Sequence, residues 1–177
     1  SVDLQFDSEG TQQAAIDSDG EGFYTWVITI DQGDYYDAYI TPFFEEIETS
    51  SARYDLDHWS EAREYNVAPG GRAFDTIEIT GFPGHHGDFS GLGDWVADDL
   101  EADVKVYGPL ESAPETEEVP QDTPVFWETT VTAENGRFNV GYDDADPIEL
   151  PQETTHATGD FYVFVYEFAG DAKVAPF

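Results

Sequence analysis

The chain of 177 residues contains no cysteine, which excludes disulfide bonds and thiolate metal sites. It also has no apolar run approaching the roughly 20 residues that a helix needs to span a bilayer, so no transmembrane segment is expected. Only six residues are lysine or arginine, and they are scattered. Without a basic patch to neutralise phosphates, the sequence argues against direct nucleic-acid binding and against anionic lipid headgroups.

Acidic residues are abundant instead, at 39, which gives a formal net charge of −33. Disorder would be the usual consequence of so much like charge, but 40% of the residues are hydrophobic and 15% are aromatic, enough to form a core. At molar salt the Debye length falls to about 3 Å, so self-repulsion is largely screened. We therefore expect a folded protein of a halophile or of its virus, with an acidic mesophilic protein as the alternative.

The strongest strand pattern lies in residues 159–170, GDFYVFVYEFAG. Both faces of such a strand are apolar, which indicates either a central strand or one that contacts the core with one face and a neighbouring subunit with the other. Tyrosine combines apolar area with a polar tip and suits a partly hydrated contact. We therefore predict a subunit interface on the aromatic face, formed by Tyr162, Phe164, Tyr166 and Phe168.

Eight to ten short strands separated by turns, with almost no amphipathic helix, predict an all-β fold. The expected architecture is a single jelly-roll-like β-barrel or sandwich of about eight strands, and an immunoglobulin-like sandwich is the alternative. One domain is expected over residues 1–177, with less regular insertions near 43–72, 81–101 and 108–123.

Two local patterns give more detailed predictions. Residues 125–132 and 137–142 flank Asn135-Gly136, a strong turn signal, and predict a β-hairpin. Between residues 50 and 66, a capping serine followed by Leu56 and Trp59 with helical spacing predicts a short helix.

Nucleophilic catalysis finds no support, because no serine lies in a Gly-x-Ser-x-Gly elbow, and the chain is not expected to be an enzyme. Two acidic turns place several oxygen ligands close together, as Ca²⁺ or Mg²⁺ prefers. One contains Asp17 and Asp19, and the other contains Asp143, Asp144 and Asp146. The alternative is that both turns are simply solvated. No other cofactor is expected besides high salt.

Other residue types with potential chemistry favour plainer interpretations. His85, His86 and Asp88 lie on a glycine-rich loop, and adjacent histidines seldom reach one ion, so an exposed loop is expected there. Trp26 and Trp127 lie in strong strand patterns and are expected in the core. Trp59 and Trp95 remain candidates for stacking against a sugar.

The combination of these features resembles the small major capsid proteins of haloarchaeal icosahedral viruses with an internal membrane. The resemblance covers the whole chain as a profile: cysteine-free, strongly acidic, all-β, without a signal peptide, and ending in an aromatic strand. It implies an upright single β-barrel that assembles with copies of itself and with a second, related capsid protein, in a shell apposed to the viral membrane. It also implies synthesis in the host cytoplasm.

The sequence therefore predicts a structural virion protein whose function is assembly. An extracellular haloarchaeal binding module, specific for carbohydrate, is the alternative.

Overall fold

The computed structural model describes residues 5–6, 12–13, 20–43, 45–116 and 118–177. The chain divides into two compact units, Ser1–Arg53 and Tyr54–Phe177, and this differs from the single domain expected over residues 1–177. The reason lies in the strand pairing, because the strands of each unit pair only within that unit.

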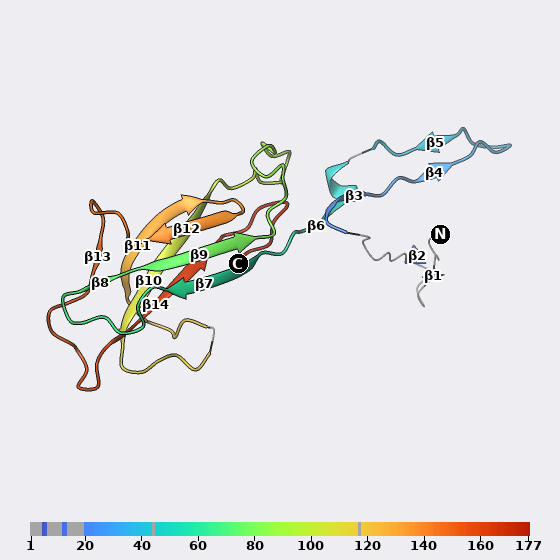
Figure 1. Ribbon diagram of the computed structural model, residues 1–177. Helices are drawn as coiled ribbons and strands as arrows, with labels where there is room; N and C mark the ends of the chain where they lie inside the picture. The colour runs from blue at the N-terminus through green and yellow to red at the C-terminus, as the bar shows by residue number, and fades with distance from the viewer. Residues whose placement is uncertain (1–4, 7–11, 14–19, 44, 117) are drawn as a thin grey trace. The chain divides into compact units, whose positions relative to one another are not determined.

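The second unit, called here the sandwich unit, is built entirely from strands (Figure 1). They are β7 (Asp57–Ala62), β8 (Arg72–Ala73), β9 (Asp75–Thr80), β10 (Glu101–Leu110), β11 (Val125–Thr132), β12 (Gly136–Val140), β13 (Ile148–Glu149) and β14 (Phe161–Glu167). One sheet has the order β12-β9-β7 and the other β11-β10-β14, with all pairs antiparallel. A short pair, β13-β8, lies beside the start of β9.

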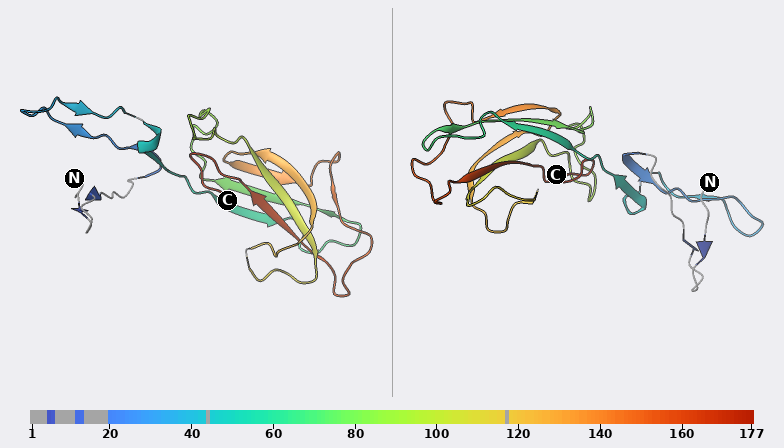
Figure 2. Two further views of the ribbon diagram at one scale, coloured as in Figure 1. Left: turned by 180° about the vertical axis from the view of Figure 1, so that it is seen from behind. Right: turned by 60° about the horizontal axis from the view of Figure 1, so that its bottom comes forward.

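The two sheets face one another as the layers of a sandwich (Figure 2). Alternate residues of β9 and β10 point inward, as their period of two predicts. Ile77 and Ile79 from one sheet meet Val104 and Val106 from the other, and all four side chains are fully buried. The predicted all-β sandwich is thus confirmed, and the described strands form no closed barrel.

The strand order follows the immunoglobulin-like alternative. In chain order, the first, second and fifth main strands (β7, β9 and β12) form one sheet, and the third, fourth and sixth (β10, β11 and β14) form the other. The C-terminal segment takes the place of the last immunoglobulin strand. Phe168 and Phe177 exchange two backbone hydrogen bonds of 2.8 and 2.9 Å, and Val174 makes a parallel bridge to Tyr54.

Two local predictions are wrong. β11 and β12 do not form a hairpin, because each pairs in a different sheet and the Asn135-Gly136 corner crosses between the sheets. The Asn135 side chain fixes this corner by accepting a hydrogen bond from the Phe82 backbone N–H and donating one to its carbonyl. The helix predicted around Trp59 is strand β7, since pairing with β9 overrides a weak helical pattern.

The first unit contains short strands and one 3₁₀ helix. They are β1 (Gln5–Phe6), β2 (Gln12–Gln13), β3 (Gly22–Thr25), β4 (Thr29–Ile30), β5 (Tyr39–Ile40), η1 (Glu46–Glu48) and β6 (Thr49–Ala52). β3 pairs with β6 and β4 with β5, so residues 22–52 form one long antiparallel hairpin that turns at residues 33–36 (Figure 1). Of residues 20–43 and 45–53, none is buried.

Candidate functional site

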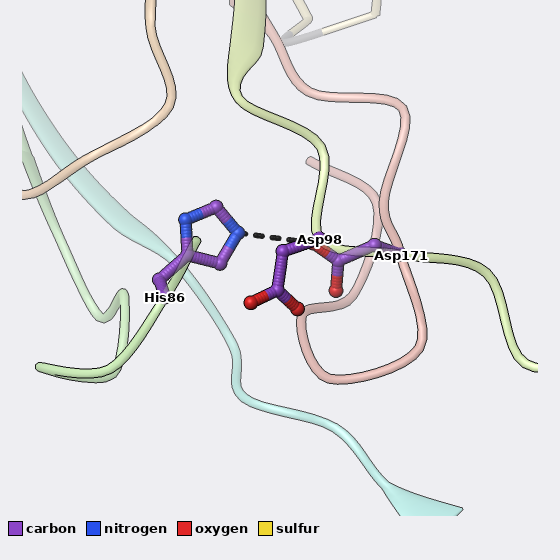
Figure 3. Close-up of side chains that lie close together, drawn as sticks. All are labelled: His86, Asp98 and Asp171. Atoms are coloured by element: carbon purple, nitrogen blue, oxygen red, sulfur yellow. Dashed lines mark hydrogen bonds and ion pairs between the residues drawn. The ribbon is translucent and has the colours of Figure 1, made fainter. Parts of the chain in front are cut away.

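A buried cluster of ionisable side chains lies where the long β9–β10 connection of the sandwich unit meets its C-terminal turn (Figure 3). His86 and Asp98 lie near the two ends of the single connection between β9 and β10, and Asp171 lies in the turn after β14. One ligand atom of each lies within 4.8 Å of the others. Among the described residues, this is the one such group of three or more potential metal ligands.

Asp98 is held by donors from two directions. Its Oδ2 atom accepts a 2.8 Å contact from the Lys173 ammonium and hydrogen bonds from the backbone N–H groups of Gly87 and Phe89. Burial opposes ionisation of Asp98, but the bonds from Lys173, Phe89 and Gly87 outweigh it and keep its pKa below its ordinary value. Its other oxygen, Oδ1, is buried and has no hydrogen-bond partner among the described residues.

Asp171 organises the C-terminal turn and reaches the histidine. Its Oδ1 atom accepts hydrogen bonds of 2.8 Å from the backbone N–H groups of Lys173 and Val174. Its Oδ2 atom accepts one from the Asp99 N–H at 3.2 Å and lies 3.0 Å from His86 Nε2. The cluster therefore joins the two ends of the β9–β10 connection to the C-terminal turn.

The three potential metal ligands of the glycine-rich loop do not lie together. His86 turns inward and packs against Phe82, with ring centroids 4.6 Å apart, whereas His85 and Asp88 are exposed. The sequence did not single out Asp98 and Asp171 as its partners, because they lie 12 and 85 residues further along the chain. Only the fold brings the three side chains together.

The three carboxylates of the acidic turn after β12, predicted to bind Ca²⁺ or Mg²⁺, engage separate partners and are not gathered as one set of ligands in the structure. Asp143 accepts from the Ala145 N–H, Asp144 contacts Arg72 at 2.6 Å, and Asp146 accepts from the Trp127 indole. The predicted ligands Asp17 and Asp19 lie outside the described residues.

The aromatic face of β14 points into the protein rather than toward a neighbour. Tyr166 and Phe168 belong to the core of the sandwich unit, so the interface expected there has no exposed ring at these positions. Burial raises the pKa of the Tyr166 hydroxyl to about 12. Tyr162 and Phe164 are half-buried and pack at the margin of the core. At Tyr166 and Phe168 the opposite sheet already covers this face, so these two rings are not available to a neighbouring subunit.

Tyr162 and Phe164 also line a cleft of about 410 Å³ in the sandwich unit. Tyr65, Phe74 and Phe161 add aromatic surface to it, and its lining contains three carboxylates but no lysine or arginine. The two tryptophans proposed for sugar stacking, Trp59 and Trp95, do not line this cleft. The Arg137 guanidinium lies 5.7 Å from the centroid of the Trp59 ring.

The most extensive exposed apolar surface lies on the hairpin of residues 22–52, called here the apolar hairpin. Its exposed large hydrophobic residues are Trp26, Val27, Ile28, Ile30, Tyr35, Tyr36, Tyr39, Ile40, Phe43 and Ile47. Trp26 was expected in the core, because the sequence of residues 23–30 is that of a strong strand. The structure divides this stretch into β3 and β4 with Trp26 between them, and none of these residues is buried.

Comparison with known proteins found no matching family, no similar curated protein and no similar solved structure. Among the described residues, no helix combines the length and the hydrophobicity needed to cross a bilayer.

Proposed function

We propose that this protein is a structural subunit that assembles with further copies of itself through the apolar hairpin, as part of the shell of a halophilic virus. The observation that carries the proposal is the hairpin itself, a long two-stranded element with apolar side chains exposed along most of its length.

Such an element is poorly suited to an isolated molecule. A lone two-stranded hairpin is marginally stable in water, and it needs a further strand or a packed face to be secure. Among the described residues no further strand pairs with either outer edge of the hairpin, and such an edge can pair with a strand of another chain. Exposed apolar patches of this extent mark interaction surfaces in soluble proteins.

The charge distribution favours a second copy as the partner. Residues 22–30 and 38–44 contain no charged side chain, although a quarter of the chain is charged. Two copies, each with a formal charge of −33, repel wherever their acidic surfaces meet, so the uncharged hairpin is where they can approach. Molar salt screens the remaining repulsion beyond about 3 Å. A specific contact of this kind buries about 1,000 Å² or more.

Analytical ultracentrifugation in molar KCl tests this mode of assembly. We expect the wild-type chain to sediment as larger species as its concentration rises. Ile40→Asp places a charge on the apolar hairpin at a side chain that is 62% exposed, and it should shift the chain to monomer. Val96→Asp is the matched control, because Val96 is 59% exposed but lies in the sandwich unit, and this variant should assemble like the wild type.

A wild-type chain that stays monomeric at every concentration would contradict assembly, as would equal effects of the two substitutions. The viral part of the proposal rests on the sequence profile and has its own test. Mass spectrometry of purified particles should detect the chain in the shell. If the chain assembles but is not found in particles, the viral part of the proposal is wrong and the structural-subunit part still holds.

A binding module is the second candidate, and the cleft favours it. Aromatic rings from Tyr65 and Phe161 line this cleft together with the neutral polar residues Asn66 and Thr158, a combination that suits an uncharged polyhydroxylated ligand such as a carbohydrate. Titration calorimetry with neutral oligosaccharides should then show saturable heat in the wild type that Tyr65→Ala abolishes. The absence of heat for the wild type would remove this candidate.

A further inference from the structure

We propose that His86, Asp98 and Asp171 bind a divalent transition-metal ion, with zinc as the ion that best fits the donor set. The site lies within the sandwich unit and does not depend on assembly through the apolar hairpin.

The geometry suits one ion. The three ligand atoms lie within 4.8 Å of one another, as they must when each is between about 2.0 and 2.4 Å from a common centre. His86 and Asp98 come from opposite ends of the β9–β10 connection and converge with Asp171 of the C-terminal turn (Figure 3). The His86 ring also packs against the rings of Phe82 and Phe168. The side chain of His86 is 5% exposed and that of Asp171 is 1% exposed.

The hydrogen bonding of Asp98 points independently to a missing partner. Its Oδ2 atom already has three donors, whereas its buried Oδ1 atom has none among the described residues. A buried carboxylate oxygen without a partner is costly, so such a group calls for a ligand. A metal ion bound to Oδ1 would satisfy it without disturbing the contacts of Oδ2.

The charges of the cluster favour the binding of a further cation. Asp98 and Asp171 are two buried carboxylates, and within the cluster one ammonium, that of Lys173, balances them. Lys173 contacts Asp98 through Oδ2, on the oxygen that the metal would not use. Buried charge without compensation is destabilising, so a bound cation would lower the free energy of the folded state.

The donor set selects the ion. Ca²⁺ and Mg²⁺ prefer oxygen ligands in larger number, whereas an imidazole nitrogen beside two carboxylates suits zinc and its neighbours in the first transition row. To bind, His86 would present Nε2 as a ligand in place of its 3.0 Å contact with Asp171. The ion would then fix the two ends of the β9–β10 connection and the C-terminal turn to one another.

Zinc titration of the full chain, stripped with a chelator and held in molar potassium nitrate, tests the proposal; nitrate avoids the competition of chloride for zinc. Calorimetry should show one saturable site. At a hundredfold excess over Kd, the thermal unfolding midpoint should rise by roughly 5–10 °C. His86→Ala and Asp98→Asn should each lose both effects, and His85→Ala, which removes the adjacent exposed imidazole, should keep them.

The wild-type chain also provides a test that needs no variant. Zn²⁺ in substoichiometric amount should shift the imidazole ¹⁵N NMR signals of His86, through direct coordination, and leave those of His85 nearly unchanged. The proposal fails if wild-type protein shows neither saturable heat nor a selective shift of the His86 signals. It also fails if Ca²⁺ and Mg²⁺ raise the midpoint as much as zinc does, since general screening would then explain the effect, or if His85→Ala is the variant that loses binding.

Discussion

The two units of this chain have similar charge densities and opposite arrangements of their apolar residues. The first 53 residues contain twelve acidic residues and one basic residue, and the sandwich unit contains 27 and five. The fully buried hydrophobic side chains of the described residues all belong to the sandwich unit. The apolar hairpin has comparable side chains, but they face solvent.

This difference shows that acidity and hydrophobic content do not decide what a segment does. In the sandwich unit, two sheets supply each other with an apolar face. The apolar hairpin has the strand sequence but no second layer among the described residues. The same residue types therefore stabilise the fold in one unit and are available for a partner in the other.

Transfer from molar salt to about 0.1 M salt should have the largest effect. The Debye length rises from about 3 Å to about 10 Å, so the acidic residues of the sandwich unit repel one another across its surface. We expect the β-sheet signal in circular dichroism to be lost and to return when salt is restored. An unchanged melting temperature in dilute buffer would contradict the halophilic origin. It would also show that charge repulsion does not limit the stability of the sandwich unit.

A pair of phenylalanine truncations contrasts the two units directly. Phe168 is 2% exposed in the core, so Phe168→Ala should lower the free energy of unfolding by about 3–5 kcal/mol. Phe43 is 81% exposed on the apolar hairpin, so Phe43→Ala should change that free energy by no more than about 0.5 kcal/mol while weakening assembly. Urea unfolding in molar salt at low protein concentration measures both. Equal losses would mean that the hairpin is buried within the monomer.

Acid should weaken the sandwich unit through Glu167. Burial opposes ionisation of this carboxyl, but hydrogen bonds from Lys105 and Tyr107 outweigh it and lower its pKa. Because the folded pKa lies below the unfolded value, this stabilisation is present above pH 4.5 or so and is lost as the pH falls through the folded pKa. Its side chain is partly exposed, so we expect about 1 kcal/mol or less.

The check is the pH dependence of urea unfolding from pH 6 to pH 3 for the wild type and for Glu167→Gln. The variant should lose less stability over this range. Parallel curves would show that Glu167 does not contribute to the acid sensitivity of the sandwich unit.

The smallest effect is expected at a surface ion pair of the sandwich unit. Arg137 contacts Glu78 across the β9–β12 pair and lies near the Trp59 ring, but both charged side chains are well exposed. Arg137→Ala should therefore cost a few tenths of a kcal/mol, and less at higher salt. Arg137→Lys keeps the positive charge but lacks the planar guanidinium that lies over the Trp59 ring, so it measures the contribution of the charge without that contact. A loss above about 2 kcal/mol would show that surface pairs, and not only the core, hold this unit together.

Local patterns predicted the strands well and their partners poorly. The alternation around Ile77 and Ile79 identifies an inward face, because side-chain direction is a property of one strand. The Asn135-Gly136 corner shows the limit, since a turn signal does not say whether the next strand stays in the same sheet. Trp26 shows the same limit of local patterns. An apolar stretch of strand-forming residues is equally consistent with a buried core strand and with an exposed hairpin.

The candidate site was harder to predict than the fold. His86 and His85 are neighbours with identical side chains, and only the path of the loop turns one inward. Asp98 and Asp171 are two among 39 acidic residues, so composition cannot distinguish them from solvated carboxylates. Their convergence with His86 depends on the path of the β9–β10 connection and on the C-terminal turn, neither of which has a sequence signature.

The scarcity of basic residues gives the boundary between the two units a biochemical consequence, because trypsin cleaves only after lysine or arginine. The five basic residues of the sandwich unit each hold an acidic or aromatic side chain with their charged group: Arg63, Arg72, Lys105, Arg137 and Lys173. Arg53 is exposed, lies outside any strand and is the last residue of the first unit. Limited digestion should therefore cut first after Arg53 and release residues 54–177 as a protected fragment, so a single protease can separate the apolar hairpin from the sandwich unit.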